Sequence, residues 1–125
     1  SGYVYNGKAV PALRGKYIFT DITTGRVWYA EYKEMLAADD GKPGTLAPFH
    51  EVKIRWNNSV YDSMFPIAEA AYQSRGGKDP GLPGRAAVSG SGRADARFGI
   101  DNAGELYVYS KTDGVIRAVT GATAK

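Results

Sequence analysis

The stretch that decides the fold is "GKYIFTDITTGRVWYAEY", residues 15–32. Two runs rich in β-branched and aromatic residues, 16–21 and 26–32, flank the polar segment "ITTG". Runs of this composition around a short polar segment predict an antiparallel hairpin. Gly25 suits the turn because glycine adopts positive φ without a steric penalty.

The design recurs near the other end of the chain, in "GELYVYSKTDGVIRAV", residues 104–119. Ten positions separate Gly15 from Gly25, and ten separate Gly104 from Gly114. Here the predicted strands cover 105–110 and 115–119, and an alternating run at 93–101 precedes them. A short antiparallel unit that recurs with a glycine-ended turn is typical of blade-type β architectures.

The remaining elements follow from local pattern. "YVYNGKAV" predicts a short strand with a turn at Asn6-Gly7, and "HEVKIRW", residues 50–56, alternates with a period of two. Residues 63–75 have helical apolar spacing, with Asp62 or Ser63 as the cap. We expect loops at 37–48 and 78–92 and a frayed tail after 119.

These elements predict a mainly β fold, built of antiparallel up-and-down sheets of the β-propeller-blade type. It would hold about two blades and one inserted α-helix in a single β-rich domain, 1–125. The blade-like units are 1–61 and 93–119, and the insertion is 62–92. The predicted buried side chains are Tyr17, Phe19, Val27, Val52, Ile54, Phe98, Ile100, Leu106, Val108 and Ile116.

Composition excludes several classes of function. The chain has 125 residues and no cysteine, so disulfides, thiolate metal sites and cysteine nucleophiles are ruled out. The net charge of +3 comes from well-mixed charges without a basic run, and we therefore expect no nucleic-acid binding. No apolar run approaches the roughly 18–20 residues that cross a membrane, so we expect no membrane insertion.

Several residues are candidates for ligand contact, each with a structural alternative. Trp28 and Trp56 could stack on sugar rings, although tryptophans in sheets more often belong to the core. Arginines at polar strand positions could line a channel for an anionic ligand, or lie on a solvated sheet face; they are Arg26, Arg55, Arg93, Arg97 and Arg117.

Single acidic and histidine side chains are weaker candidates. His50 lacks partners in the sequence, and a surface or strand-edge position is the simpler interpretation. Asp21 could hold a cation with Asp39 or Asp40, but closing an Asx-turn is the commoner use of such an aspartate. "DDGKPG", residues 39–44, lacks the ligand pattern of an EF-hand calcium loop.

Residues 2–28 resemble the PQQ-dependent soluble sugar dehydrogenases, the glucose/sorbosone dehydrogenase family of six-bladed β-propellers. The family pattern runs approximately G-x-Y-x-Y-R-G-x-x-x-P-x-L-x-G-x-Y-x-F-x-D-x-x-x-G-R-I-W. The matching residues are Gly2, Tyr3, Tyr5, Gly7, Pro11, Leu13, Gly15, Tyr17, Phe19, Asp21, Gly25, Arg26 and Trp28. Asn6 replaces the common Arg and Thr20 the common Gly. "FGIDNAGELYV", residues 98–108, is similar to the family's closing blade, F-G-x-D-x-x-G-E-L-Y-V.

The resemblance implies that the chain corresponds to the last two blades of such a propeller. In that family PQQ and calcium lie over the central channel, and the catalytic histidine comes from earlier blades. His50 matches no catalytic motif of the family, so no catalytic residue is assigned and the chain is expected to be inactive alone. PQQ and calcium, and a periplasmic or secreted location, are implied only by this resemblance.

Two functions therefore remain open from the sequence. One is a C-terminal propeller module related to these dehydrogenases. The other is a free-standing β-rich binding domain for a carbohydrate or a protein. Because two isolated blades leave strand edges and sheet faces uncovered, we also expect a homo-oligomer formed through them.

Overall fold

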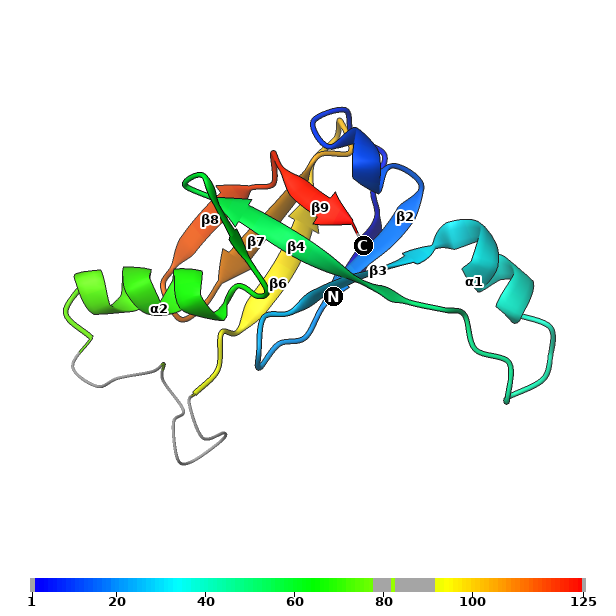
Figure 1. The fold of residues 1–125 in the computed structure, drawn as a ribbon, viewed down its shortest axis with the longest axis horizontal. Coiled ribbons are helices and arrows are strands. Elements are labelled where there is room, and N and C mark those ends of the chain that lie inside the picture. The colour runs from blue at the N-terminus through cyan, green and yellow to red at the C-terminus, as the bar shows by residue number, and fades with distance from the viewer. Residues whose placement is uncertain (1, 78–81, 83–91, 125) are drawn as a thin grey trace.

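The structure is a computed structural model that describes residues 2–77, 82 and 92–124. These residues form a mainly β fold with antiparallel sheets and two α-helices (Figure 1). The predicted 78–92 loop, apart from residues 82 and 92, lies outside the described part. In chain order the elements are β1 (Gly2–Val4), the 3-10 helix η1 (Pro11–Leu13), β2 (Lys16–Thr20), β3 (Val27–Glu31), α1 (Tyr32–Ala38), β4 (His50–Trp56), β5 (Ser59–Tyr61), α2 (Phe65–Ser74), β6 (Ala96–Ile100), β7 (Leu106–Ser110), β8 (Val115–Ala118) and β9 (Ala122–Ala124).

The first sheet is an antiparallel meander in which β1 to β5 follow one another in chain order. The predicted hairpin of β2 and β3 is confirmed, with Phe19 opposite Trp28. β9 joins this sheet from the far end of the chain by pairing with β4. Val52 of β4 pairs with both Val27 of β3 and Ala124 of β9, so β9 occupies the edge of β4 away from β3. The prediction of a frayed tail is therefore wrong, because this edge offers residues 122–124 backbone hydrogen bonds.

The second sheet is the meander β6-β7-β8, as predicted. Its β7–β8 turn repeats the geometry of the β2–β3 turn. Gly25 N–H donates to the carbonyl of Asp21, and Gly114 N–H donates to the carbonyl of Ser110, both at 2.9 Å. The two glycines have φ of +71° and +69°. The sequence repeat is thus a repeat of local structure.

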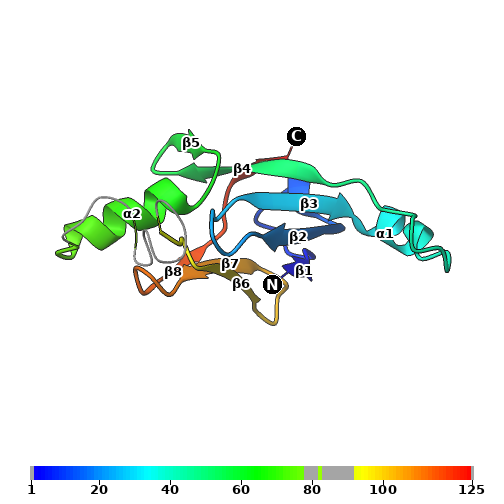
Figure 2. The ribbon, with the colours of Figure 1, turned by 90° about the horizontal axis from the view of Figure 1, so that it is seen from below.

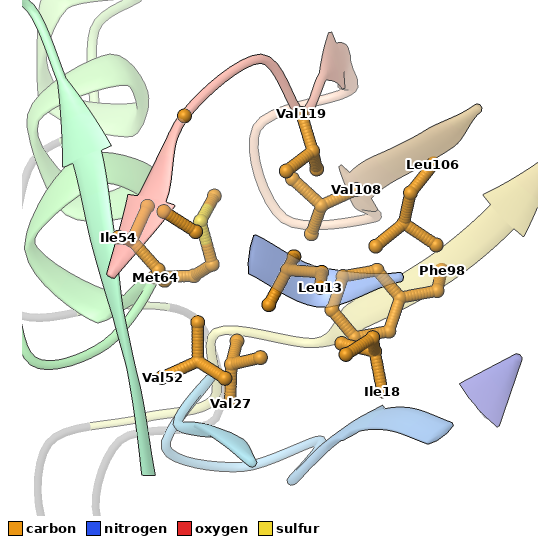
Figure 3. A pocket seen from close by; sticks show the side chains of 12 residues that line it. Leu13, Ile18, Val27, Val52, Ile54, Met64, Phe98, Leu106, Val108 and Val119 are labelled. Atoms are coloured by element: carbon orange, nitrogen blue, oxygen red, sulfur yellow. The ribbon is translucent and has the colours of Figure 1, made fainter. Parts of the chain in front are cut away.

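The two sheets enclose one core, and Figure 2 shows β6 and β7 next to β1, below β2, β3 and β4, with α1 and α2 at opposite ends. β1 and β2 lie against β6 across the interface. Side chains from both sheets, with Leu13 of η1 and Met64, point into the space between them (Figure 3). They leave an apolar cavity of only about 30 Å³, so the core is nearly filled.

The predicted core is confirmed in most of the second sheet and in β3 and β4. Buried as predicted are Val27, Val52, Phe98, Leu106 and Val108, while Ile54 is partly buried against them. In β2 the prediction chose the wrong face. Ile18 is 1% exposed in the core, whereas Tyr17 and Phe19 are half-buried on the opposite face. The apolar run Tyr17-Ile18-Phe19 has no polar residue that would mark its outer side.

The prediction also reversed the faces of β8. Ile116, predicted to be buried, is 72% exposed, and Ile100 at the end of β6 is 39% exposed. Arg117, placed on a polar face, lies opposite Val108 and is 7% exposed. A buried arginine needs a buried counter-charge, which Asp113 supplies.

The helix predicted over 63–75 is α2, with Pro66 in its first turn. Ser63 Oγ accepts a hydrogen bond of 3.3 Å from the amide of Phe65. In contrast, α1 was not predicted, since 26–32 was expected to be strand and no element was assigned to 33–36. β3 ends where β2 begins, because Glu31 pairs with Lys16. The chain beyond Glu31 therefore has no partner strand, and its good helix formers Lys-Glu-Met-Leu-Ala-Ala form a helix.

The short strand predicted before Asn6-Gly7 is confirmed as β1, but the turn there does not form a hairpin. β1 pairs with β2 instead of with the residues that follow Gly7. The amides of Lys8 and Ala9 donate to a carboxylate oxygen of Glu105, which directs this segment toward the second sheet. The carboxylate of Glu105, distant in the sequence, thus accepts the amide hydrogen bonds that a partner strand would otherwise accept.

Candidate functional site

The outer face of the first sheet carries a row of aromatic rings. The rings of Tyr17 and Phe19 are stacked at 5.7 Å between centroids, and those of Phe19 and Trp28 at 5.9 Å. Phe49, which is 64% exposed, meets Phe19 edge-on at 6.4 Å. We call these four residues the outer aromatic row. Three of them line an open hollow of about 400 Å³ together with Met35 of α1.

This position corrects the interpretation of Trp28 as a core residue. Trp28 lies opposite Glu51 in the sheet, on the side away from the core. The predicted candidate Arg26 forms an ion pair with the same Glu51. Trp28, one of the two candidate tryptophans, thus lies beside the Arg26–Glu51 ion pair and near the three other rings of the outer aromatic row.

The outer face of the second sheet is also apolar in part. Tyr109, 37% exposed, lies opposite Ile116 of β8 and opposite Arg97 of β6. The predicted candidate Arg97 is 3.1 Å from a carboxylate oxygen of Asp95, and Arg93 is 3.5 Å from the same oxygen. Both arginines therefore have an anionic partner within the chain.

Two of the remaining predicted candidates lie together at the β4–β5 turn. Arg55 and Trp56 line an open, polar hollow of about 420 Å³ with Asn57, Asn58, Thr120 and Gly121. We call this the turn hollow. The asparagines have φ of 48° and 65°, values that asparagine tolerates better than most residues with a Cβ. Sequence reasoning did not select them, although consecutive asparagines between two strand-like runs are a signal for a tight turn.

The structure does not gather the five arginines into one channel. Arg26 lies on one outer face, Arg93 and Arg97 are held by Asp95, and Arg55 lies at the turn hollow. Arg117 is buried in an ion pair with Asp113 at 2.7 Å, their side chains being 5% and 0% exposed. The interpretation as a single anion channel is therefore wrong.

The buried pair organises the region between the sheets. Val115 N–H donates to Asp113 Oδ1 at 2.9 Å, and Arg75, the residue after α2, donates to the carbonyl of Asp113. The guanidinium carbon of Arg117 lies 5.1 Å from the centroid of the Trp56 ring. This cation–π contact attaches Trp56 to the second sheet. The Nε and Nη1 groups of Arg117 have no partner in the described residues.

A second polar cluster joins the two motif segments. Tyr5 Oη donates to Glu105 Oε2 at 2.7 Å and accepts from the amide of Val10 at 2.9 Å. We call the contacts of Glu105 with Tyr5, Lys8 and Ala9 the clasp. Hydrogen bonds from the Lys8 amide and from Tyr5 hold the pKa of Glu105 below its usual value. Burial, and then the bond to Glu105, raise the pKa of Tyr5.

The remaining acidic candidates and His50 have local structural roles. Asp21 Oδ2 accepts from the amide and the hydroxyl of Thr24, and these bonds lower the pKa of Asp21. Asp40 accepts from the Lys42 amide and the Thr45 hydroxyl. The turn-closing interpretation of Asp21 is therefore confirmed. His50 is exposed at the start of β4, with its ring 5.0 Å from that of Tyr29.

Within residues 2–77, 82 and 92–124, no three His, Asp or Glu side chains are arranged to hold a metal ion. We therefore derive no catalytic step through calcium or PQQ. In the same part of the chain, neither helix has the length and apolar character needed to span a membrane.

Comparison of this chain with family models, curated proteins and solved structures finds no match. The candidate functional features of this chain are therefore its two outer faces, the turn hollow and the motif residues themselves.

Proposed function

We propose that this chain is a non-catalytic module of about two blades, related to the propellers of the PQQ-dependent sugar dehydrogenases. The observation that carries the proposal is that both outer faces of the packed sheets bear exposed apolar side chains. A sandwich that functions alone turns apolar residues inward and polar residues outward. A blade inside a propeller instead has a neighbouring blade on each face.

The two outer faces differ in detail but share this character. On the first sheet the outer aromatic row includes Phe49, 64% exposed. On the second sheet Ile116 is 72% exposed beside Tyr109. Apolar side chains that cluster on a surface, rather than occurring singly, mark interaction sites. Two such surfaces on opposite sides of one sandwich support neighbours on both sides.

Strand order supports the same proposal. Apart from β9, each sheet is a meander of consecutive strands, and β1, the first strand of one, lies against β6, the first strand of the other. Neighbouring blades around a channel have this relation between their innermost strands. The clasp also joins Tyr5 and Glu105, which both belong to the segments that resemble the family.

We expect the chain alone to self-associate through these faces, and light scattering after size exclusion tests this. The parent chain should be oligomeric at micromolar concentration, and Phe49→Arg combined with Ile116→Arg should make it monomeric. Leu36→Arg is the control, because Leu36 is 59% exposed on α1 and is not among the described residues that line the hollow beside the outer aromatic row. A parent chain that is monomeric throughout would contradict the proposal.

A dye-reduction assay with glucose, PQQ and Ca²⁺ tests the non-catalytic part. We expect no glucose-dependent reduction, since no catalytic residue of the family could be placed on this chain. Dye reduction by the purified chain would overturn the non-catalytic part of the proposal. It would not bear on the outer faces, which the self-association experiment tests.

The outer aromatic row favours a second candidate, a free-standing carbohydrate-binding domain. Aromatic rings aligned on an exposed sheet face can stack on successive sugar rings of a polysaccharide. Sedimentation with insoluble cellulose or chitin distinguishes the two functions. A monomeric parent chain that is retained, and a Trp28→Ala variant that is not, would support this candidate over the propeller module.

A further inference from the structure

The connection after β1, which contains Asn6-Gly7, lies beside the turn between β6 and β7 (Figure 1). A Cβ on Gly104 of that turn would lie 3.1 Å from the carbonyl carbon of Asn6 and 3.2 Å from the nitrogen of Gly7. A Cβ on Gly7 would lie 2.5 Å from Glu105 Oε2. The peptide bond between Asn6 and Gly7 is therefore enclosed by the turn and by the clasp.

The clasp holds the backbone on both sides of this peptide bond. The amides of Lys8 and Ala9, which follow Gly7, both donate to Glu105. Tyr5, which precedes the pair, donates to the same carboxylate through its hydroxyl. Gly7 itself is buried, and within the described residues its N–H has no hydrogen-bond acceptor. This nitrogen is thus fixed in place without being bonded.

An asparagine followed by glycine is chemically reactive, because glycine has no Cβ to obstruct the approach of its own nitrogen. That nitrogen, after losing its proton to hydroxide, forms a bond to the side-chain carbonyl carbon of the asparagine and expels the amide group as ammonia. Water then opens the resulting succinimide ring at either carbonyl. The products are aspartate and isoaspartate, of which isoaspartate has an additional methylene group in the main chain.

We propose that Asn6 is a site of spontaneous deamidation and that the clasp controls its rate. The ring closes only when the backbone between residues 6 and 7 rotates, and the contact with Gly104 opposes this rotation. The carboxylate of Glu105 also opposes loss of the Gly7 proton, because two negative charges would then lie side by side. Deamidation therefore proceeds when the clasp opens locally. This proposal goes beyond the proposed function, because it requires neither a propeller nor the outer faces.

Deamidation also prevents the clasp from closing again. Isoaspartate at position 6 lengthens the main chain between Tyr5 and Lys8. The Tyr5 hydroxyl and the Lys8 amide, each 2.7 Å from an oxygen of Glu105, then no longer reach this carboxylate together. Asn6 is exposed, so water reaches the ring and ammonia leaves freely. The pair thus acts as a one-way release of the contact between the connection after β1 and the β6–β7 turn.

Peptide mass spectrometry of the full chain during incubation at mildly alkaline pH tests the proposal. The peptide that contains residue 6 should gain the mass of Asn-to-Asp conversion at least about fivefold more slowly in buffer than in urea, which unfolds the chain. Glu105→Gln should raise the rate in buffer at least about fivefold, because it removes the charge and weakens the clasp. Equal rates in the parent and in Glu105→Gln, or in buffer and in urea, would overturn the proposal.

Two further variants and an internal reference separate local opening from other causes. Gly25→Ala destabilises the β2–β3 turn without touching the clasp, so it should leave the rate at residue 6 unchanged. Asn6→Gln keeps the amide but needs a larger ring, and it should not deamidate in the same period. Asn58, at the exposed β4–β5 turn, should react at the same rate in the parent and in Glu105→Gln. A Gly25→Ala chain that deamidates at residue 6 as fast as Glu105→Gln would show that global unfolding, and not the clasp, sets the rate.

The effect on the clasp is measured on the aged parent chain. Deamidated chains carry an additional negative charge and therefore separate from the unmodified chains by ion exchange. They should unfold at a lower urea concentration than the unmodified chains. An unchanged urea midpoint would show that the clasp survives the modification, and it would contradict the one-way release.

Discussion

The hydroxyl of Tyr5 and the carboxylate of Glu105 are joined by a 2.7 Å hydrogen bond across one hundred positions of sequence. The bond links the connection after β1 to the turn between β6 and β7. A Cβ on Gly7 would lie 2.5 Å from Glu105 Oε2, so a larger residue there would have to displace the carboxylate of the clasp. The clasp explains in physical terms why Tyr5, Gly7 and Glu105 occur together in this chain.

Tyr5→Phe should destabilise the fold by about 1–3 kcal/mol, because it leaves the buried amide of Val10 without an acceptor and Glu105 Oε2 without its donor. Urea unfolding measures the change. Tyr107→Phe is the matched control, since its hydroxyl bonds to Asp101 at an exposed position and should cost about 0.5 kcal/mol or less. Equal losses in the two variants would mean that the clasp adds no stability.

The stability of the chain should decrease in acid. Hydrogen bonds from backbone amides and side chains lower the pKa values of Asp21, Asp101 and Glu105 from ordinary values of 3.8, 3.8 and 4.5. Because the unfolded chain binds these protons at higher pH than the folded chain, the stabilisation is full above the ordinary values. It is lost as the pH falls through the lowered folded values.

Glu105→Gln tests this dependence. The variant should be less stable than the parent at neutral pH, and its urea midpoint should decrease less between neutral pH and acid. Glu34→Gln, at an exposed position on α1, should keep the slope of the parent. A Glu105→Gln chain with the parent's acid dependence would show that Glu105 is not one of the responsible groups.

Gly25→Ala should cost more stability than Gly114→Ala, although the two turns have the same geometry. Both variants must place alanine at positive φ, at roughly 1–2 kcal/mol each. At Gly25 the added Cβ would also lie 2.9 Å from Cβ of Met64 and 3.0 Å from Cβ of Ala94. At Gly114 the nearest contact is 3.7 Å, to the end of the Arg75 side chain. Thermal unfolding of the two variants measures the difference, and equal losses would contradict the close packing at Gly25.

Asp113→Asn should destabilise the chain by about 3–5 kcal/mol, because it leaves the buried guanidinium of Arg117 without its counter-charge. Adding Arg117→Met should restore part of this loss, since the double variant buries no charge at the site. Urea unfolding of the single and double variants checks the result. A double variant less stable than Asp113→Asn would show that Arg117 stabilises the core mainly through its contact with Trp56.

The sequence by itself determined the local structure where its pattern is unambiguous. Alternation in "HEVKIRW" identified β4 and its buried Val52, and the glycine-ended segments identified both hairpins with their turns. These features depend on residues that are close in sequence, so backbone preference and period-two burial suffice to predict them. The helix over 65–74 followed in the same way from apolar spacing and Pro66.

Only the tertiary structure decided which face of each strand is buried. Tyr17, Ile18 and Phe19 are all apolar, and packing of the second sheet selects Ile18 for the core. In β8 the ion pair with Asp113 allows Arg117 to be buried. Its neighbour Ile116 points to the other face of the strand and is therefore exposed. A shift of one residue exchanges the two faces of a strand, and local sequence does not specify it where both neighbours are apolar.

The candidate sites depend on the same long-range choices. Trp28 and Trp56 were both named from the sequence, but the fold puts one on the outer aromatic row and the other at the turn hollow. Thr120 reaches that hollow only because β9 pairs with β4, which no local pattern near the C-terminus indicates. Sequence determines which side chains are available, whereas contacts between distant strands determine which of them meet, because a strand's partner is chosen by the whole sheet.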